Sequence, residues 1–440
     1  MTATLTLASM RFYGRLTELS AAQRRALVTR SSAADAGITA TTARIIADVR
    51  ARGDVALYAL ARELDGVALD GLEVPRNTID RALNEIDTKV RRALERTAAN
   101  VASVHSAFMP RTMETRPEAG IVVGRRPDPL ARVGVYAPGG RAVYPSSVLM
   151  AAIPARVARV GEVILASPPR ANGLPSDAVL AAAAIAGVDR VFAIGGAGAI
   201  AALAIGTESV PRVDRIVGPG NAYVAAAKVA LSAEVGIDCA AGPSELLIVA
   251  DDTATASRIA DEMVAQAEHD PMACVVAVVT DEKLAADIER ELLDRAGTAA
   301  RGEIVRAALG TSGAVLVADG VDDAIAFASE YAPEHLMLAV RDADSLLARV
   351  RNAGTVFVGD TSSVAFGDYM TGANHVLPTG GTARWASGLS PLDFVRWTTY
   401  QRVDPAAAQS LAGDVALLAD CEGLPGHART ALSASEASLR

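Results

Sequence analysis

The last turn of a predicted helix, in the segment DEMVAQAEHDPMACVVAVVT (residues 261–280), carries two side chains that can bind a metal ion. Gln266 lies seven residues after Ile259 and three after Met263, so it continues the apolar stripe of the helix and should point toward the core. His269 follows one turn later and projects toward the same ligand. Buried amides and imidazoles need partners, so the two residues either bond to main-chain carbonyls or form part of a cation site, which the negative end of a helix favours.

Four of the five histidines lie after residue 268, in polar or glycine-containing contexts. Besides His269 they are His335 in YAPEHL, His375 in GDYMTGANHVLPTGG and His427 in CEGLPGHA. The fifth, His105, stands in a helical stretch, and we predict an ordinary packed or capping histidine there. This distribution favours the cation site.

Zinc binds imidazole nitrogen and carboxylate oxygen, and zinc sites that keep coordination positions free act on substrates. Gln266, His269, one carboxylate and one more histidine would make such a site. Asp368 in the turn FGDYMTG has the best context for the carboxylate, although a structural turn aspartate explains that residue equally well. His427 and His375 are alternatives for the last ligand.

The motif PEHL places Glu334 next to His335 after a proline. Adjacent residues of a strand point to opposite faces, so both can act on one substrate only at the end of an element. A carboxylate and an imidazole are proton acceptors of different basicity, which suits a reaction with more than one proton transfer. The alternative is a solvated glutamate beside a histidine at the edge of the core.

Three glycine-rich stretches follow predicted strands: VYAPGG (135–140), VGPGNAYV (217–224) and VFAIGGAGAIAALA. The last fits G-x-G-x-x-A through Gly196, Gly198 and Ala201, a pattern that can hold a pyrophosphate on main-chain amides. The match is weak, because such glycines often serve helix–strand packing alone. No Walker lysine motif and no G-x-S-x-G motif is present, which argues against NTP hydrolysis and a serine hydrolase.

Length and composition indicate a globular protein that acts on small molecules. The 440 residues, 51% of them hydrophobic, suffice for two or more domains. A net charge of -9 argues against nucleic acid or an anionic membrane as the main partner. Three scattered cysteines suit a reducing compartment, and the start of the chain lacks the apolar core of a signal peptide, so we expect a cytoplasmic protein.

Short β-rich runs such as ARVGVY, EVILAS, LLIVA and CVVAVV alternate with alanine-rich helical stretches from residue 121 onward. We predict an α/β protein with two Rossmann-like parallel-sheet domains, one inserted in the other, with a helical N-terminal segment and a C-terminal helical tail. The predicted parts are an arm (1–30), an α/β domain with the metal and catalytic motifs (31–135 and 245–385), an inserted Rossmann-like domain (136–244) and a tail (386–440). The tail has too little apolar surface for its own core and should dock on another part of the molecule or on a second subunit.

Taken in order, these motifs resemble those of histidinol dehydrogenase. The resemblance extends from about residue 30 to residue 430 and rests on VYAPGG, YPSSVLM, GPGNAYV, AGPSELL, AQAEH, YAPEHL, GDYMTGANHVLPT and EGLPGH. It implies an NAD-dependent enzyme that oxidises L-histidinol through L-histidinal to L-histidine, with one zinc ion per subunit. The zinc would mainly anchor the substrate, and the inserted domain would bind NAD.

The resemblance also implies residue roles. Glu334 and His335 would be the acid–base pair, and the zinc ligands would be Gln266, His269, Asp368 and His427, the last from the partner subunit of a homodimer with a shared active site. The substrate would lie among Ser244, Gln266, His269, His335, Asp368, His375, Glu422 and His427. Tyr136 and Asn221 would contact NAD; at the third cofactor position the family usually has Gln where this chain has Gly198, so one NAD contact is missing.

Three other functions fit part of these residues. An enzyme of the same fold could act on another small alcohol, such as a sulfonated diol, although Glu422 and His427 favour the amino alcohol. The predicted metal set with a glutamate base also suits a zinc hydrolase. A non-catalytic, metal-stabilised dimer is disfavoured by the density of polar motifs.

Overall fold

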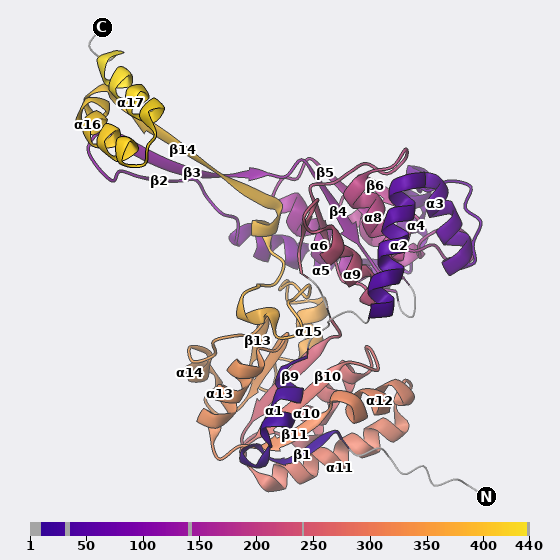
Figure 1. The fold of residues 1–440 in the computed structure, drawn as a ribbon. Coiled ribbons are helices and arrows are strands. Elements are labelled where there is room, and N and C mark those ends of the chain that lie inside the picture. Colours follow the sequence, from indigo (N-terminus) through magenta and orange to yellow (C-terminus); the bar gives the residue numbers. More distant parts are fainter. Residues whose placement is uncertain (1–9, 31–35, 140–142, 240–241, 438–440) are drawn as a thin grey trace, which may run out of the picture. The chain divides into compact units, whose positions relative to one another are not determined.

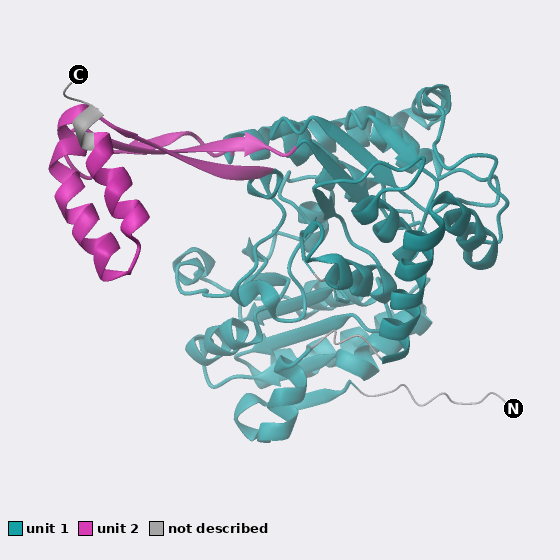
Figure 2. Cartoon of the chain, turned by 45° about the horizontal axis from the view of Figure 1, so that its top comes forward, with its two compact units in different colours: residues 1–108, 131–394 teal, residues 109–130, 395–440 magenta. Residues whose placement is uncertain are grey.

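The computed structural model describes residues 10–30, 36–139, 143–239 and 242–437 (Figure 1). The chain forms two compact units (Figure 2). Unit 1 comprises residues 1–108 and 131–394, and unit 2 comprises residues 109–130 and 395–440. No helix in the described part of the chain is long and apolar enough to cross a membrane.

Unit 1 contains two parallel sheets within its described residues. The larger sheet has the strand order β1 (Phe12–Arg15), β11 (Ala314–Val317), β10 (Cys274–Val279), β9 (Glu245–Ala250), β12 (His335–Ala339) and β13 (Thr355–Val358). Its central strands β9 and β10 are buried along their whole length, as expected for a parallel sheet covered on both faces.

Helices cover both faces of the larger sheet (Figure 1). Side chains of β9 alternate between the two cores: Leu246 and Ile248 pack with Met263 on one face, while Leu247 and Val249 pack with the opposite cluster. The first face carries α10 (Ala256–Ala267), α11 (Glu282–Thr298) and α12 (Gly302–Ser312), and the second carries α1 (Ala21–Val28) and α13 (Val321–Tyr331). Shorter helical segments of unit 1 are η1 (Leu16–Glu18), α14 (Ala343–Leu347), α15 (Val364–Tyr369), η3 (Thr382–Arg384) and η4 (Pro391–Phe394).

The smaller sheet has the strand order β6 (Arg190–Phe192), β5 (Glu162–Ala166), β4 (Arg132–Tyr136), β7 (Arg215–Val217) and β8 (Gly236–Ile237). It packs with α6 (Pro145–Val157), α7 (Asp177–Ile185), α8 (Gly196–Ile205) and α9 (Ala222–Leu231). A layer from the N-terminal part of the chain covers these helices: α2 (Ala36–Arg52), α3 (Asp54–Leu60), η2 (Ala61–Asp65), α4 (Arg76–Glu85) and α5 (Thr88–Ala107).

The two sheets repeat one topology. Apart from the added edge strand β1, each has its strands in the spatial order third, second, first, fourth and fifth along the chain. This is the Rossmann order, in which the connections reverse direction beside the first strand. The prediction of two Rossmann-like parallel-sheet domains is confirmed.

Several helices and strands belong to a different sheet from the one that the predicted domain boundaries assigned to them. Helices α2 to α5, assigned by prediction to the metal-bearing domain (31–135), contact the helices of the smaller sheet instead. Strand β4 ends at Tyr136, so the smaller sheet begins before the predicted boundary, and β1 of the predicted arm (1–30) pairs with β11. The physical reason is packing, because α2 buries Ile45 and Val49 in the core that α8 and α9 form.

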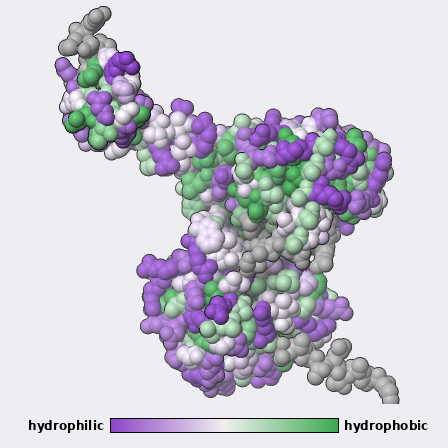
Figure 3. All heavy atoms as spheres, viewed as in Figure 1, coloured by the Kyte–Doolittle hydropathy of each residue, from purple (hydrophilic) through white to green (hydrophobic). Residues whose placement is uncertain are grey.

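Unit 2 combines a small antiparallel sheet with a helical hairpin. Strand β14 (Val395–Val403) pairs with β3 (Ile121–Pro129), which pairs with β2 (Met113–Thr115), and α16 (Pro405–Cys421) packs on α17 (Pro425–Ala437). The predicted tail (386–440) is therefore helical only in part. The buried core of the hairpin consists of alanines, whereas Leu417 and Leu418 are 71% and 66% exposed. Green, hydrophobic residues are visible on the surface of this unit in Figure 3.

Candidate active site

The predicted catalytic residues lie where two adjacent strands of the larger sheet begin. Glu245 is the first residue of β9 and His335 the first residue of β12, and the two strands pair in parallel. Glu334 directly precedes β12, so the turn that brings both members of the predicted pair to one place is present. These residues occupy the amino edge of the sheet, whereas Rossmann-type sheets usually bind ligands at the carboxyl edge.

A cavity of about 1790 Å³ in unit 1 is lined from both sheets. The smaller sheet contributes its carboxyl edge, where Tyr136 ends β4 and Asn221 follows β7. The cavity exceeds the roughly 300–1,000 Å³ of ordinary small-molecule pockets, so it has room for a cofactor and a substrate. Its lining includes Tyr136, Gly198, Asn221, Ser244, Gln266, His269, Glu334, His335, Asp368 and His375.

The main chain of Glu245 determines which nitrogen of His335 carries a proton. Nδ1 of His335 lies 2.9 Å from the Glu245 carbonyl oxygen, which can only accept, so Nδ1 donates. Nε2 is buried without a hydrogen-bond partner among the described residues and lies 3.6 Å from Oδ1 of Asp368. The neutral imidazole therefore presents Nε2 as its proton acceptor on the Asp368 side.

The surroundings of His335 also favour its protonated form. Burial, the largest effect, lowers the pKa of His335, but the Glu334 and Asp368 carboxylates outweigh it and hold the pKa well above the ordinary value. A cation bound by Asp368 would cancel part of this effect. The proton affinity of Nε2 thus depends on what Asp368 binds.

Glu334 is buried beside the imidazole. Its Oε2 accepts a hydrogen bond from the Glu245 N–H at 2.7 Å and lies 3.4 Å from Nδ1 of His335. Burial raises the pKa of Glu334, which keeps the carboxyl closer to its neutral form than in water. A carboxyl group whose pKa is raised in this way holds a proton more readily, which suits a group that accepts and returns protons.

Asp368 lies in α15 as an anion. Burial acts to raise its pKa, but the neighbouring imidazoles, above all that of His335, outweigh burial, so the pKa of Asp368 is lowered. The Asp368 carbonyl oxygen accepts a hydrogen bond from Nδ1 of His375 at 2.9 Å, and Nε2 of His375 lies 3.4 Å from the hydroxyl of Ser147. Burial lowers the pKa of His375, so this imidazole is a neutral hydrogen-bonding group.

The end of α10 contributes the two polar residues predicted there. Gln266 is 3% exposed, and its Nε2 has no partner within the described residues. His269 follows the helix and lines the same cavity as Gln266 and Asp368. The carbonyl oxygen of a glutamine side chain, an imidazole and a carboxylate that line one cavity form a ligand set that fits a cation.

The residues described here do not bring three or more His, Cys, Asp or Glu side chains close enough to hold a metal ion by themselves. Unit 1 supplies His269 and Asp368 from that group of residue types, with Gln266 as a third donor of another type. The remaining predicted ligand, His427, lies in α17 of unit 2. Glu422 also belongs to unit 2, where it follows the last residue of α16.

The predicted cofactor residues lie at, or bond to, the starts of helices. The Tyr136 hydroxyl accepts a hydrogen bond from the Gly196 N–H at 3.0 Å, where α8 begins, and burial raises the pKa of Tyr136 to about 12. Asn221 caps α9, since its Oδ1 accepts from the N–H groups of Tyr223 and Val224, which leaves Nδ2 to donate to a ligand.

Comparison with known proteins assigns the family. The family model for histidinol dehydrogenase matches residues 28–433. The chain belongs to the histidinol dehydrogenase family. A histidinol dehydrogenase of Methanosarcina mazei is 46% identical over 420 residues, which cover 94% of this chain and 96% of that protein. One from Halobacterium salinarum is 47% identical over 417 residues, covering 94% of this chain and 97% of that protein.

The crystal structure of a histidinol dehydrogenase from Elizabethkingia anophelis superposes with a TM-score of 0.93 at 30% identity and covers 98% of this chain and 99% of that one. The predicted family and fold class are therefore confirmed, and family membership makes the chain an oxidoreductase of the dehydrogenase type.

Gly198 is enclosed by neighbouring side chains. A Cβ at Gly198 would lie 2.7 Å from Cδ1 of Leu60 and 3.7 Å from Cδ2 of Leu57. The leucine side chains thus occupy the space through which a longer residue would leave α8. Close helix packing is therefore sufficient to explain a glycine at this position of the G-x-G-x-x-A match, and a phosphate contact is not needed for it.

Sequence patterns did not single out Arg30, Glu245 or Ser147 as site residues, although all three line the cavity or bond to residues that do. The available signal for Glu245 is a charged residue at the start of the apolar strand ELLIVA. His105, in contrast, is a packed histidine as predicted: it is 2% exposed and makes an edge contact with Phe108.

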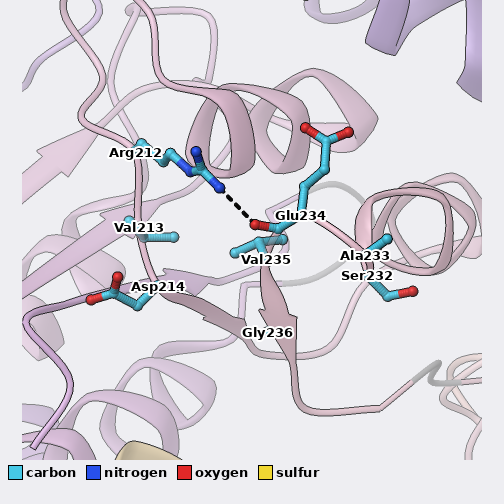
Figure 4. Close-up of a pocket in the computed structure, with 8 residues that line it drawn as sticks. All are labelled: Arg212, Val213, Asp214, Ser232, Ala233, Glu234, Val235 and Gly236. Carbon is cyan, nitrogen blue, oxygen red and sulfur yellow. Dashed lines mark hydrogen bonds between the residues drawn. The ribbon is translucent and has the colours of Figure 1, made fainter. Parts of the chain in front are cut away.

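A smaller hollow of about 400 Å³ lies before β7 and β8 and is lined by Arg212, Val213, Asp214, Ser232, Ala233, Glu234, Val235 and Gly236 (Figure 4). The Arg212 guanidinium donates to the main-chain oxygen of Glu234 at 2.8 Å across it. It contains none of the predicted site residues of the histidinol dehydrogenase motifs, so the larger cavity is the candidate active site.

Proposed function

We propose that this protein is a zinc- and NAD-dependent histidinol dehydrogenase, which oxidises L-histidinol through L-histidinal to L-histidine in the last steps of histidine biosynthesis. The observation that carries the proposal is the buried pair Glu334 and His335, with Nε2 of His335 facing the anionic Asp368. A proton acceptor next to a cation-binding carboxylate suits the oxidation of an alcohol that the cation holds.

Zinc would be held by Gln266, His269, Asp368 and the partner subunit's His427. The buried Gln266 amide in the cavity lining and the anionic Asp368 carboxylate support this set. When bound, zinc would anchor and orient the imidazole and the amine of the substrate. Because the set contains one formal negative charge, it suits neutral nitrogen donors of a substrate.

Proton transfers would be divided between the two catalytic residues. His335 would accept the alcohol proton at Nε2 while hydride leaves the carbon for the nicotinamide. Glu334 would take a proton from the water that adds to the aldehyde, while His335 would return its first proton to the aldehyde oxygen. His335, neutral again, would then accept a proton as the hydrate is oxidised. His375, a neutral group fixed by the Asp368 carbonyl, would bind an N–H group of the substrate at Nε2, with Ser244 and Glu422 completing its surroundings.

NAD would bind at the carboxyl edge of the smaller sheet. Support comes from Asn221, whose Nδ2 is left to donate, and from Tyr136 at the end of β4. Gly198 adds no side chain there, so we expect main-chain groups of α8 to replace the usual glutamine contact.

A homodimer with shared active sites would explain two features of unit 2. Glu422 and His427 belong to a helical hairpin with an alanine core, and Leu417 and Leu418 are exposed on that hairpin. Covering these leucines with a second copy would remove apolar surface from water.

The deciding experiment measures NADH formed per L-histidinol consumed at limiting substrate, with zinc and after chelation. About two NADH per substrate, lost on chelation and restored by zinc, is the result expected for two hydride transfers. No NADH from L-histidinol would reject the proposed function and redirect the search to other alcohols and then to hydrolysis.

A further inference from the structure

Glu245 contacts both members of the catalytic pair through its main chain. Its N–H donates to Oε2 of Glu334 at 2.7 Å, and its carbonyl oxygen accepts from Nδ1 of His335 at 2.9 Å. One residue thus orients the carboxylate and selects the imidazole tautomer.

The side chain of Glu245 is itself immobilised. It is 2% exposed and forms an ion pair with Arg30, with distances of 2.9 Å from Nε to Oε1 and 3.0 Å from Nη2 to Oε2. It also accepts hydrogen bonds from the N–H groups of Gly380 at 2.8 Å and Glu334 at 3.3 Å. The Glu245 carboxylate therefore links the start of β9 to Glu334, one of the two catalytic residues.

Arg30 extends this restraint to the turn before the catalytic pair. Its Nη2 donates to the carbonyl oxygen of Tyr331 at 2.9 Å, and its guanidinium lies 3.4 Å from the centre of the Tyr331 ring. Ala332, the next residue, has a left-handed φ of 53°, and the chain then reaches Glu334 through Pro333. Arg30 thus stabilises a strained turn that directs Glu334 and His335 into the cavity.

We propose that Arg30 and Glu245 are positioning residues for the reaction, acting through the orientation of Glu334 and His335. A buried ion pair adds little net stability compared with apolar residues of similar size, so its place in a densely hydrogen-bonded network points to a role in orientation. The bidentate geometry supplies that orientation, because only an arginine matches both carboxylate oxygens while it bonds to a carbonyl. The activity test below rests on the proposed function.

The test compares two conservative variants, Glu245→Gln and Arg30→Lys, which keep size or charge but lose the bidentate pairing. We expect kcat for L-histidinol and for L-histidinal to fall roughly 10- to 100-fold, as expected for displaced catalytic groups, while both KM values stay within about twofold. The matched control is Arg24→Ala, which breaks an exposed ion pair with Glu330 and should leave kcat unchanged.

Two results would overturn the proposal: unchanged kcat in folded variants, or loss of folding in both variants, which would assign the pair to stability. A second readout, the ¹⁵N NMR signals of the His335 ring, does not depend on turnover. The protonated Nδ1 signal should be present in the wild type and shifted in Glu245→Gln, and an unshifted signal contradicts the proposal. If the wild type forms no NADH, the proposed function fails while the NMR signal still decides the role of Glu245.

Discussion

Glu262 joins the helix that carries Gln266 to the helix that carries Asp368, because its Oε2 accepts a hydrogen bond from the Val364 N–H at 3.1 Å. The far end of α15 is also held, since Asn100 of α5 donates to the carbonyl oxygen of Met370 at 2.7 Å. These hydrogen bonds therefore hold the two elements that carry two of the proposed zinc ligands.

We expect Glu262→Leu to weaken zinc binding about 10-fold or more, because groups that orient metal ligands typically contribute factors of that size. Competition with a chelating dye measures the dissociation constant directly. Asp261→Asn, in the preceding and exposed position of the same helix, is the control and should bind zinc normally. Unaltered affinity in folded Glu262→Leu would show that α15 does not need this bond.

Glu334 and His335 should affect the two oxidations differently. Glu334→Gln should slow the oxidation of L-histidinal more than that of L-histidinol, because only the second needs an activated water. His335→Asn should slow both by roughly 10²–10⁴-fold, the usual size of general-base catalysis. Stopped-flow NADH traces separate the two steps, and equal losses for Glu334→Gln would refute the assigned division.

A shared site predicts complementation between inactive chains. His427→Ala and His335→Asn homodimers should both be inactive, whereas a mixed dimer contains one site with an intact His335 and an intact His427. Differently tagged chains allow purification of the mixed dimer, which should regain up to about half of the wild-type activity, one of its two sites being intact. A mixed dimer without activity would argue against the exchange of His427 between subunits.

The enclosed position of Gly198 predicts that a side chain there strains the fold. Gly198→Ala should lower the free energy of unfolding by about 1–3 kcal/mol, because its Cβ overlaps Leu60. The double variant Gly198→Ala, Leu60→Ala should recover part of that loss in urea titrations. Gly297→Ala in α11, where a Cβ meets nothing within 4 Å, is the control. Additive losses in the double variant would mean that the two residues do not compete for space.

Because His105 is buried, we expect the folded protein to lose stability in acid. Burial lowers the pKa of His105 to about 4, whereas an unfolded histidine titrates near 6.5. The unfolded state therefore binds the proton first, so the stability is complete above about pH 6.5 and is lost as the pH falls toward 4. His105→Leu should reduce this loss.

At pH 7 the same variant should also be more stable, because both ring nitrogens of His105 lack partners among the described residues. Urea unfolding at pH 7 and pH 5 gives both differences. Parallel pH dependence in the wild type and in His105→Leu would assign the acid sensitivity to other groups.

Local sequence patterns were sufficient to predict many strands of this protein and several residues of its candidate site. The apolar runs of β9 and β10 predicted buried parallel strands, since both faces of such strands are covered and their composition shows it. The helical spacing of Gln266 and His269 predicted polar groups turned inward at the end of α10. The motif PEHL predicted a pair at the end of an element, and Glu334 and His335 lie at the end where β12 begins. These features depend on neighbours in the chain.

Other features follow only from the tertiary structure, because they depend on contacts between residues that are distant in the sequence. Arg30 and Glu245 are 215 positions apart, and Glu245 and His335 are 90 apart, so no local pattern places them in one network. The apolar faces of α2 to α5 suit either sheet, and packing assigned them to the smaller one. From the sequence alone, either ring nitrogen of a neutral His335 could carry the proton. In the structure Nδ1 carries it, because the carbonyl oxygen of Glu245 beside Nδ1 can only accept a hydrogen bond.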